Sequence, residues 1–253
     1  MPIIQDFWTS LSATTPARIA LGRTGASLPT HEILKFSMAH ARARDAVHTP
    51  FNRDQVAAEI HALGFETIFV ASAAPDRASY LRRPDWGRML SPVSRDDLAS
   101  LLSHPVDLAI IVADGLSATA IHRQAAPLLH AFKPYIALAG WTTAPVVIAT
   151  QARVALGDEI GELLHARAAI LLVGERPGLS SPDSLGIYLT YAPHHGRNDG
   201  ERNCISNVRP EGLRHDLAAF KLAWLVNQAL TRQLTGVTLK DEADEALPLA
   251  QFP

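Results

Sequence analysis

Four short, uninterrupted apolar runs in the second half of the chain constrain its fold more than any other feature. They cover residues 107–113, 144–149, 168–173 and 185–191. A run that is apolar at every position indicates a strand buried on both faces. Helical stretches at about 117–131 and 156–166 separate the first three runs, and this alternation is typical of a parallel sheet with crossover helices. We therefore predict an α/β fold with a Rossmann-like parallel sheet domain.

The first hundred residues differ from this pattern and favour helix. Helices are expected at about 30–46 and 54–64, where Gly64 suits a left-handed cap. Residues 74–92 are rich in Pro, Arg and Asp, which is typical of a long ordered loop. We place a domain boundary near residue 100. The prediction is then a mostly helical N-terminal region (1–100) followed by the α/β domain (101–253).

Helical spacing also appears at the two ends of the chain. Residues 3–11 form either a short docking or targeting helix or a segment that packs on its own domain. The last helix is expected at about 211–234. It carries Leu213, Leu217, Phe220 and Trp224 at helical spacings, which predicts a stripe buried in the core.

Composition and charge exclude several classes of protein. Lys and Arg number 23 and Asp and Glu 25, so the net charge of −2 offers no general attraction for nucleic acid or an anionic membrane. No apolar stretch reaches the roughly 18 residues of a membrane span. The single cysteine, Cys204, cannot form an internal disulfide and favours a reducing compartment. We expect no nucleic-acid or membrane partner.

The segments that follow the apolar runs are the candidate binding site, because ligands of open α/β sheets bind beyond the carboxyl ends of the strands. These segments cover residues 114–117, 150–157, 174–178 and 192–199. Glu175 comes directly after a buried strand and is costly to desolvate unless it accepts hydrogen bonds or meets a cation. Arg153 and Arg176 are candidate cations. The alternative is a salt bridge that merely closes the end of the strand.

The sequence lacks the motifs of the common cofactor sites and nucleophiles. It contains no GxGxxG, no Walker phosphate loop, no GxSxG and no histidine pair at the spacing of a helical metal site. Ser117, near Asp114 and His122, suggests a hydrolase but is better explained as a helix cap. Cys204 is either a small buried thiol or part of a polar segment that lies against a ligand. We expect no metal ligand in this chain, and none of these patterns identifies a catalytic residue.

Five longer motifs resemble the small (light, or β) subunit of ethanolamine ammonia-lyase, an adenosylcobalamin-dependent enzyme that converts ethanolamine to acetaldehyde and ammonia. They are ARARDAVH at 41–48, VADGLS at 112–117, ARVALGDEIG at 152–161, GERPGLSSPDSLGIYLT at 174–190 and RNCISNVRPEG at 202–212. The resemblance covers roughly residues 17–242. It departs mainly at the N-terminus, where members of the family often carry a longer leader.

The resemblance implies a division of labour between two subunits. The large subunit, a TIM barrel, binds ethanolamine and carries out the radical rearrangement, while the small subunit helps to hold the cobalamin at the interface. In the family, positions that match Val154, Glu175 and Cys204 line the cobalamin. No Asp-x-His-x-x-Gly motif is present, so the cofactor is expected to be base-on.

The resemblance also implies an assembly and a location. Family members assemble from six large and six small subunits and often reside in a bacterial microcompartment, with the cytoplasm as the other location. The N-terminal hundred residues are expected to contact the ethanolamine ammonia-lyase large subunit. Two alternatives remain at this point: a stand-alone hydrolase that uses Ser117 or Cys204, and a purely structural partner of the large subunit.

Overall fold

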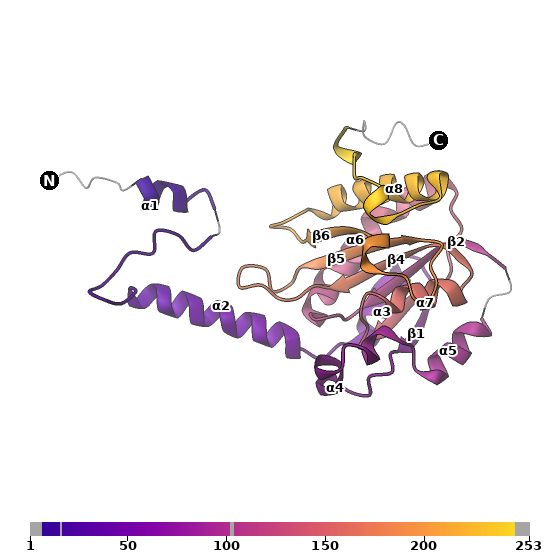
Figure 1. Ribbon diagram of the computed structural model, residues 1–253, viewed down its shortest axis with the longest axis horizontal. Helices are drawn as coiled ribbons and strands as arrows, with labels where there is room; N and C mark the ends of the chain where they lie inside the picture. The colour runs from indigo at the N-terminus through magenta and orange to yellow at the C-terminus, as the bar shows by residue number, and fades with distance from the viewer. Residues whose placement is uncertain (1–6, 16, 102–103, 246–253) are drawn as a thin grey trace.

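A six-stranded sheet with the strand order β1-β3-β2-β4-β5-β6 forms the centre of the molecule (Figure 1). The computed structural model describes residues 7–15, 17–101 and 104–245. The strands are β1 (Thr67–Ala71), β2 (Val106–Ala113), β3 (Val146–Thr150), β4 (Ala166–Gly174), β5 (Leu185–Tyr191) and β6 (Asn203–Val208). Strands β1 to β4 are parallel, and β5 and β6 extend the sheet in antiparallel pairing. The predicted α/β class is confirmed.

Helices cover both faces of the sheet. The helices of the described chain are α1 (Phe7–Ser12), α2 (Thr30–His48), α3 (Arg53–Ala62), α4 (Arg77–Arg82), α5 (Pro92–Ala99), α6 (Ala118–Ala139), α7 (Leu156–Leu163) and α8 (His215–Arg232). Leu108 and Ile110 of β2 join the core formed with α3, α6 and α8. Ala109 and Ile111 join the second core, formed with α5 and α7. Both faces of β2 are therefore shielded from water, which explains why residues 108–113 are all apolar.

The sheet extends across the boundary predicted near residue 100. The first hundred residues are mostly helical, yet they also provide β1, which pairs with β3 from Thr67 to Ala71. Helix α3 buries Val56 and Ile60 in the same core as α6. β1 is an edge strand with an exposed Phe69. Its apolar run covers only residues 68–71, and periodicity alone cannot distinguish a strand from a helix segment in so short a run. The predicted loop at 74–92 contains α4 and a 3₁₀ turn at Trp86–Arg88.

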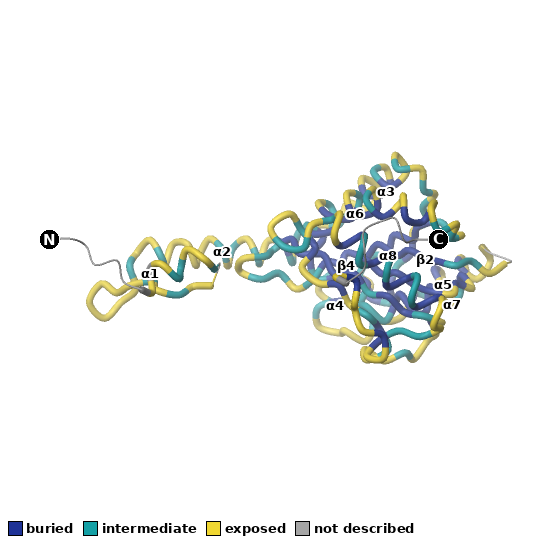
Figure 2. The backbone as a smooth tube through the Cα atoms, turned by 90° about the horizontal axis from the view of Figure 1, so that it is seen from above, coloured by how far each residue is buried: buried dark blue, intermediate teal, exposed yellow. Residues whose placement is uncertain are grey.

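Helices α1 and α2 project away from the sheet and its covering helices as an arm (Figures 1 and 2). Ala46, close to the end of α2, is the buried residue of that helix. The helix expected at 3–11 is described from residue 7 onward, where α1 begins, and residues 1–6 lie outside the described part of the chain. Among the described helices, none has the length and apolarity that crossing a bilayer requires.

The buried face of α8 differs from the predicted stripe. The helix begins at His215, and Leu217 is 50% exposed. Phe220 and Trp224 are partly buried at the rim of the core, while the buried face is rich in alanine, including Ala219 and Ala223. The stripe prediction was wrong for Leu217 and holds in part for Leu213, Phe220 and Trp224, which pack against the core without being fully buried. The fully buried face combines these alanines with Leu222 and Val226, and the small side chains let α8 pack closely on α6.

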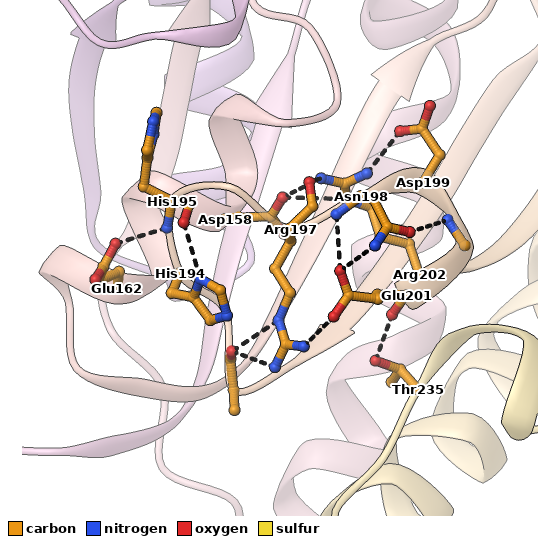
Figure 3. A network of polar contacts seen from close by, with 12 residues as sticks. Asp158, Glu162, His194, His195, Arg197, Asn198, Asp199, Glu201, Arg202 and Thr235 are labelled. Carbon is orange, nitrogen blue, oxygen red and sulfur yellow. Dashed lines mark hydrogen bonds and ion pairs between the residues drawn. The ribbon is translucent and has the colours of Figure 1, made fainter.

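A buried arginine anchors the loop between β5 and β6 to α7 (Figure 3). The Arg202 and Asp158 side chains are only 2% and 3% exposed, and Arg202 Nε donates to Asp158 Oδ2 at 3.0 Å. Arg202 also donates to Asp199 Oδ1 at 2.6 Å and to the Arg197 carbonyl at 2.8 Å. Burial raises the pKa of Asp158, and Arg202 opposes that rise. The network fixes the position at which β6 begins.

Two glycines allow the ends of β2 and β4 to approach each other closely. Gly115 follows β2 with a left-handed φ of +55°, and a Cβ there would lie 2.3 Å from the Gly174 carbonyl oxygen. A Cβ at Gly174 would lie 2.1 Å from the Ser117 carbonyl oxygen. Neither contact is possible with a side chain present, so both residues must be glycine for the strand ends to meet.

We expect Arg202→Met to destabilise the protein by about 3–5 kcal/mol, because it leaves the Asp158 carboxylate buried without its counter-charge. Urea unfolding of the purified protein measures the loss. The control is Asp199→Asn, which removes an exposed partner of the same arginine and should cost less than about 1 kcal/mol. Equal unfolding midpoints for the two variants would contradict a structural role for the buried pair.

Gly115→Ala is expected to cost roughly 2–4 kcal/mol of unfolding free energy, since it combines a left-handed backbone with a steric clash. Gly140→Ala is the matched control, because Gly140 has a φ of +66°, but apart from its chain neighbours no described residue has an atom within 4 Å of the position that a Cβ would take. The unfolding free energy of this control should fall only by the cost of placing alanine in a left-handed backbone conformation, about 1 kcal/mol. Thermal or urea unfolding distinguishes the two, and equal losses would show that the close approach is unimportant.

Candidate binding site at the carboxyl edge of the sheet

A pocket of about 360 Å³ lies at the carboxyl ends of β2, β3 and β4. Its walls come from residues just after these strands, together with one tyrosine from α4 and one from β5. The lining residues are Tyr80, Gly115, Leu116, Ala152, Arg153, Val154, Val173, Gly174, Glu175, Arg176 and Tyr188. The chain leaves β2 toward α6 on one face of the sheet and leaves β3 toward α7 on the other. Such a switch point is where open α/β sheets bind ligands.

The structure brings two of the three predicted site residues into this pocket. Val154 and Glu175 both line it, and Cys204 lies on its flank. Cys204 pairs directly with Tyr188 across β5 and β6, and directly opposed residues share one face of a sheet. The thiol is exposed, with Sγ 3.3 Å from the Ser206 hydroxyl oxygen. The alternative of a small buried thiol was therefore wrong.

Glu175 is held by hydrogen bonds and lacks the arginine partner that the sequence suggested. Its Oε2 accepts from the Ser184 hydroxyl and from the Asn207 backbone N–H, the latter at 3.2 Å. Within the described residues, neither Arg153 nor Arg176 forms an ion pair with it, and Oε1 accepts no hydrogen bond. The carboxylate is thus oriented through one oxygen, and the other remains available at the pocket wall.

Arg153 is a second polar group of the pocket, with a guanidinium that is fixed in position. Its Cζ lies 4.3 Å from the centre of the Tyr80 ring, and its Nη2 donates to the Tyr80 carbonyl oxygen at 3.3 Å. Its backbone N–H donates to the Gly87 carbonyl at 2.7 Å. Sequence analysis predicted that Arg153 lies in the loop after β3, but it considered this arginine only as an ion-pair partner for Glu175.

Tyr80 lines the pocket and packs against the Arg153 guanidinium. Sequence analysis did not identify this role. The residue is fully buried, and its hydroxyl donates to the Ala152 carbonyl at 3.1 Å. The ring lies between two guanidinium groups, with Arg77 at 4.9 Å and Arg153 at 4.3 Å. Burial raises the pKa of Tyr80, so the phenol stays neutral. The surrounding Pro- and Arg-rich segment predicted a loop, which gave no sign that this side chain would be buried.

A buried carboxylate links the pocket to the arm. Asp114, at the end of β2, accepts from Arg77 Nη1 at 3.3 Å and from the Ala152 backbone N–H at 3.2 Å. Burial raises the pKa of Asp114 to about 6, and Arg77 opposes the rise. Arg77 also donates to the Val47 carbonyl in α2 at 3.0 Å and to the Gly115 carbonyl at 2.7 Å. One arginine therefore joins α2, β2 and the edge of the pocket.

Ser117 caps a helix and has no catalytic geometry. It is fully buried, accepts from the Ala120 N–H at 3.2 Å and donates to the Pro182 carbonyl at 2.9 Å. His122 Nε2 instead accepts from the Asn52 N–H at 3.0 Å. The predicted cap is confirmed, and the arrangement gives no support to a serine hydrolase. The part of the chain that the structure describes also contains no group of three or more His, Cys, Asp or Glu side chains placed to hold a metal ion.

Comparison with known proteins identifies relatives of this chain over nearly its full length. The family model for the ethanolamine ammonia-lyase light chain (EutC) matches residues 5–240. The ethanolamine ammonia-lyase small subunit of Pseudomonas putida (strain GB-1) is 54% identical over 249 residues, which cover 96% of this chain and 90% of that protein. The small subunit of Ralstonia nicotianae is 53% identical, with 97% and 92% covered. The chain therefore belongs to the ethanolamine ammonia-lyase light-chain family.

Proposed function

We propose that this chain is the small subunit of a lyase complex that converts ethanolamine to acetaldehyde and ammonia, and that it forms one wall of a base-on adenosylcobalamin site. Val154, Glu175 and Cys204 are the proposed contacts. The supporting observation is that Val154 and Glu175 line one pocket at the carboxyl edge of the sheet, with Cys204 on its flank. Sequence reasoning about strand ends and the family resemblance lead to this same edge.

The residues of the pocket fit the edge of a corrinoid. The corrin ring carries amide side chains, which need both acceptors and donors, and the pocket offers Glu175 Oε1 and the Arg153 guanidinium. Among the described residues, the buried Arg153 Nε has no hydrogen-bond partner. Such a group needs an explanation, and movement of the guanidinium onto a ligand oxygen would supply one. Val154 and the Tyr188 ring supply apolar contact.

The size of the pocket supports a cofactor site to which this chain contributes one part. Ligand pockets span roughly 300–1,000 Å³, and about 360 Å³ is too little to enclose a corrin with its nucleotide tail. A second wall must come from another chain. When bound, adenosylcobalamin supplies the radical chemistry. The residues of this chain would orient the cofactor edge and exclude water from it, while the large subunit would bind and convert the substrate.

The exposed arm supports contact with the large subunit. Leu34 and Met38 of α2 are 64% and 56% exposed and lie four residues apart, so they share one face of the helix. Isolated helices are marginal in water, and α2 has little core of its own. A cavity of about 610 Å³ between α2 and residues 179–182 continues this apolar surface. We propose that the large subunit covers it.

The assembly and location belong to the same proposal. The family resemblance supports a complex of six large and six small subunits, located in a bacterial microcompartment or otherwise in the cytoplasm. The relatives are named small subunits, which supports the existence of a larger partner chain.

Glu175→Gln is expected to weaken cobalamin binding by the complex about 10- to 100-fold, the equivalent of one hydrogen bond to a charged group. Glutamine can keep the Ser184 and Asn207 hydrogen bonds through its oxygen, which leaves an amide instead of an acceptor at the pocket. Spectral titration with cobalamin measures the affinity of the complex and of the large subunit alone.

The control is Glu66→Gln, an exposed glutamate at the opposite edge of the sheet, next to β1. It should bind as the unmodified complex does. Equal affinity of the large subunit with and without this chain would favour a purely structural partner. Ammonia release from ethanolamine by this chain alone would contradict the division of labour.

Leu34→Glu combined with Met38→Glu is expected to weaken association with the large subunit by at least about tenfold, because two charges would enter an apolar interface. Co-purification and analytical ultracentrifugation measure the association. Circular dichroism of the variant chain should be unchanged, since both side chains are exposed. Val237→Glu introduces a charge at an exposed position after α8 and should leave association intact. Undiminished association of the double variant would remove the arm from the interface.

A further inference from the structure

Arg153 combines three properties that structural arginines seldom share. It lines the pocket, its Nε is buried without a hydrogen-bond partner, and it takes part in no ion pair within the described residues. The partly buried Arg77 also has an unpartnered nitrogen, Nη2, among the described residues, but its charge is paired with Asp114, and the buried Arg202 is paired with Asp158. The unused donors of Arg153 therefore represent binding capacity that the chain itself does not satisfy.

The fold holds the Arg153 guanidinium in one place. The Tyr80 ring supports one of its faces, and Nη2 is tied to the Tyr80 carbonyl. Gly87 packs against the stem, where a Cβ would lie 2.8 Å from Arg153 Cγ. A planar, stacked guanidinium loses little further freedom when it binds, and its donors match an oxygen acceptor with two lone pairs.

The charges around the pocket favour an acceptor with negative character. Two cations, Arg153 and Arg176, line it, and Glu175 is the carboxylate among the lining residues. Asp114, the nearest buried carboxylate after β2, is engaged by Arg77. An excess of positive charge stabilises an anion or a strongly polarised oxygen more than it stabilises a neutral donor.

We propose that Arg153 is a cofactor-specificity residue that donates hydrogen bonds to an acceptor oxygen of cobalamin. The oxygen belongs either to the phosphodiester of the nucleotide tail or to an amide carbonyl of the corrin edge. The inference rests on the proposed function and adds a contact to it. Glu175 recognises donors and Arg153 recognises acceptors, so that together they would set both the position and the orientation of the corrinoid.

Arg153→Gln and Arg153→Lys in the complex with the large subunit test this assignment. Equilibrium binding of hydroxocobalamin, and of cobinamide, which lacks the nucleotide tail, is measured by spectral titration without turnover. We expect Arg153→Gln to weaken hydroxocobalamin binding about 10- to 100-fold. Arg153→Lys should recover part of it, because lysine retains the charge but loses the planar fork. Arg232→Gln, at the far end of α8, is the charge-matched control.

The cobinamide measurement identifies the oxygen. Unchanged cobinamide affinity in Arg153→Gln assigns the contact to the phosphodiester, and an equal loss for both corrinoids assigns it to an amide carbonyl. Binding by Arg153→Gln equal to that of the unmodified complex, with an unchanged unfolding midpoint, would overturn the proposal. That result is distinct from failure of the proposed function, in which the unmodified complex would bind cobalamin no better than the large subunit alone.

Discussion

Burial of β2, β3 and β4 on both faces is the constraint on which the rest of the structure depends. Helices on the two sides bury residues 108–113 of β2, 146–149 of β3 and 168–174 of β4, so a polar side chain reaches a ligand most readily beyond the carboxyl ends of these strands. The loops after the strands therefore carry the chemistry. The glycine contact between Gly115 and Gly174 brings two of those loops together and creates a single wall.

In each polar side chain of that wall, one atom forms a hydrogen bond within the chain and another does not. Glu175 uses one carboxylate oxygen for internal hydrogen bonds, and Arg153 uses one nitrogen in the same way. The internal bonds orient each group, and the remaining atoms stay available. The two side chains are therefore preorganised. The conformational entropy that they lose on becoming ordered is lost during folding and not during binding.

The arm and the pocket are physically connected through Arg77. Its guanidinium contacts the Val47 carbonyl of α2, the Asp114 carboxylate and the Gly115 carbonyl. If the large subunit covers the arm, the same residues that order α2 also brace the edge of the proposed cofactor wall. Assembly and cofactor binding would then depend on a shared set of hydrogen bonds.

The sequence alone determined the fully buried strands, the α/β class, the cap at Ser117 and the edge at which Val154 and Glu175 lie. These features follow from local patterns: continuous apolar runs, a hydroxyl before a helix and the direction of parallel strands. Tertiary structure decided what depends on contacts between distant residues. It added the edge strands β1, whose apolar run covers only residues 68–71, and β6, whose sequence NCISNV is mostly polar. It also turned the alanines of α8 toward the core. It also placed the Tyr80 ring beneath Arg153, a contact between residues 73 positions apart that no local pattern encodes.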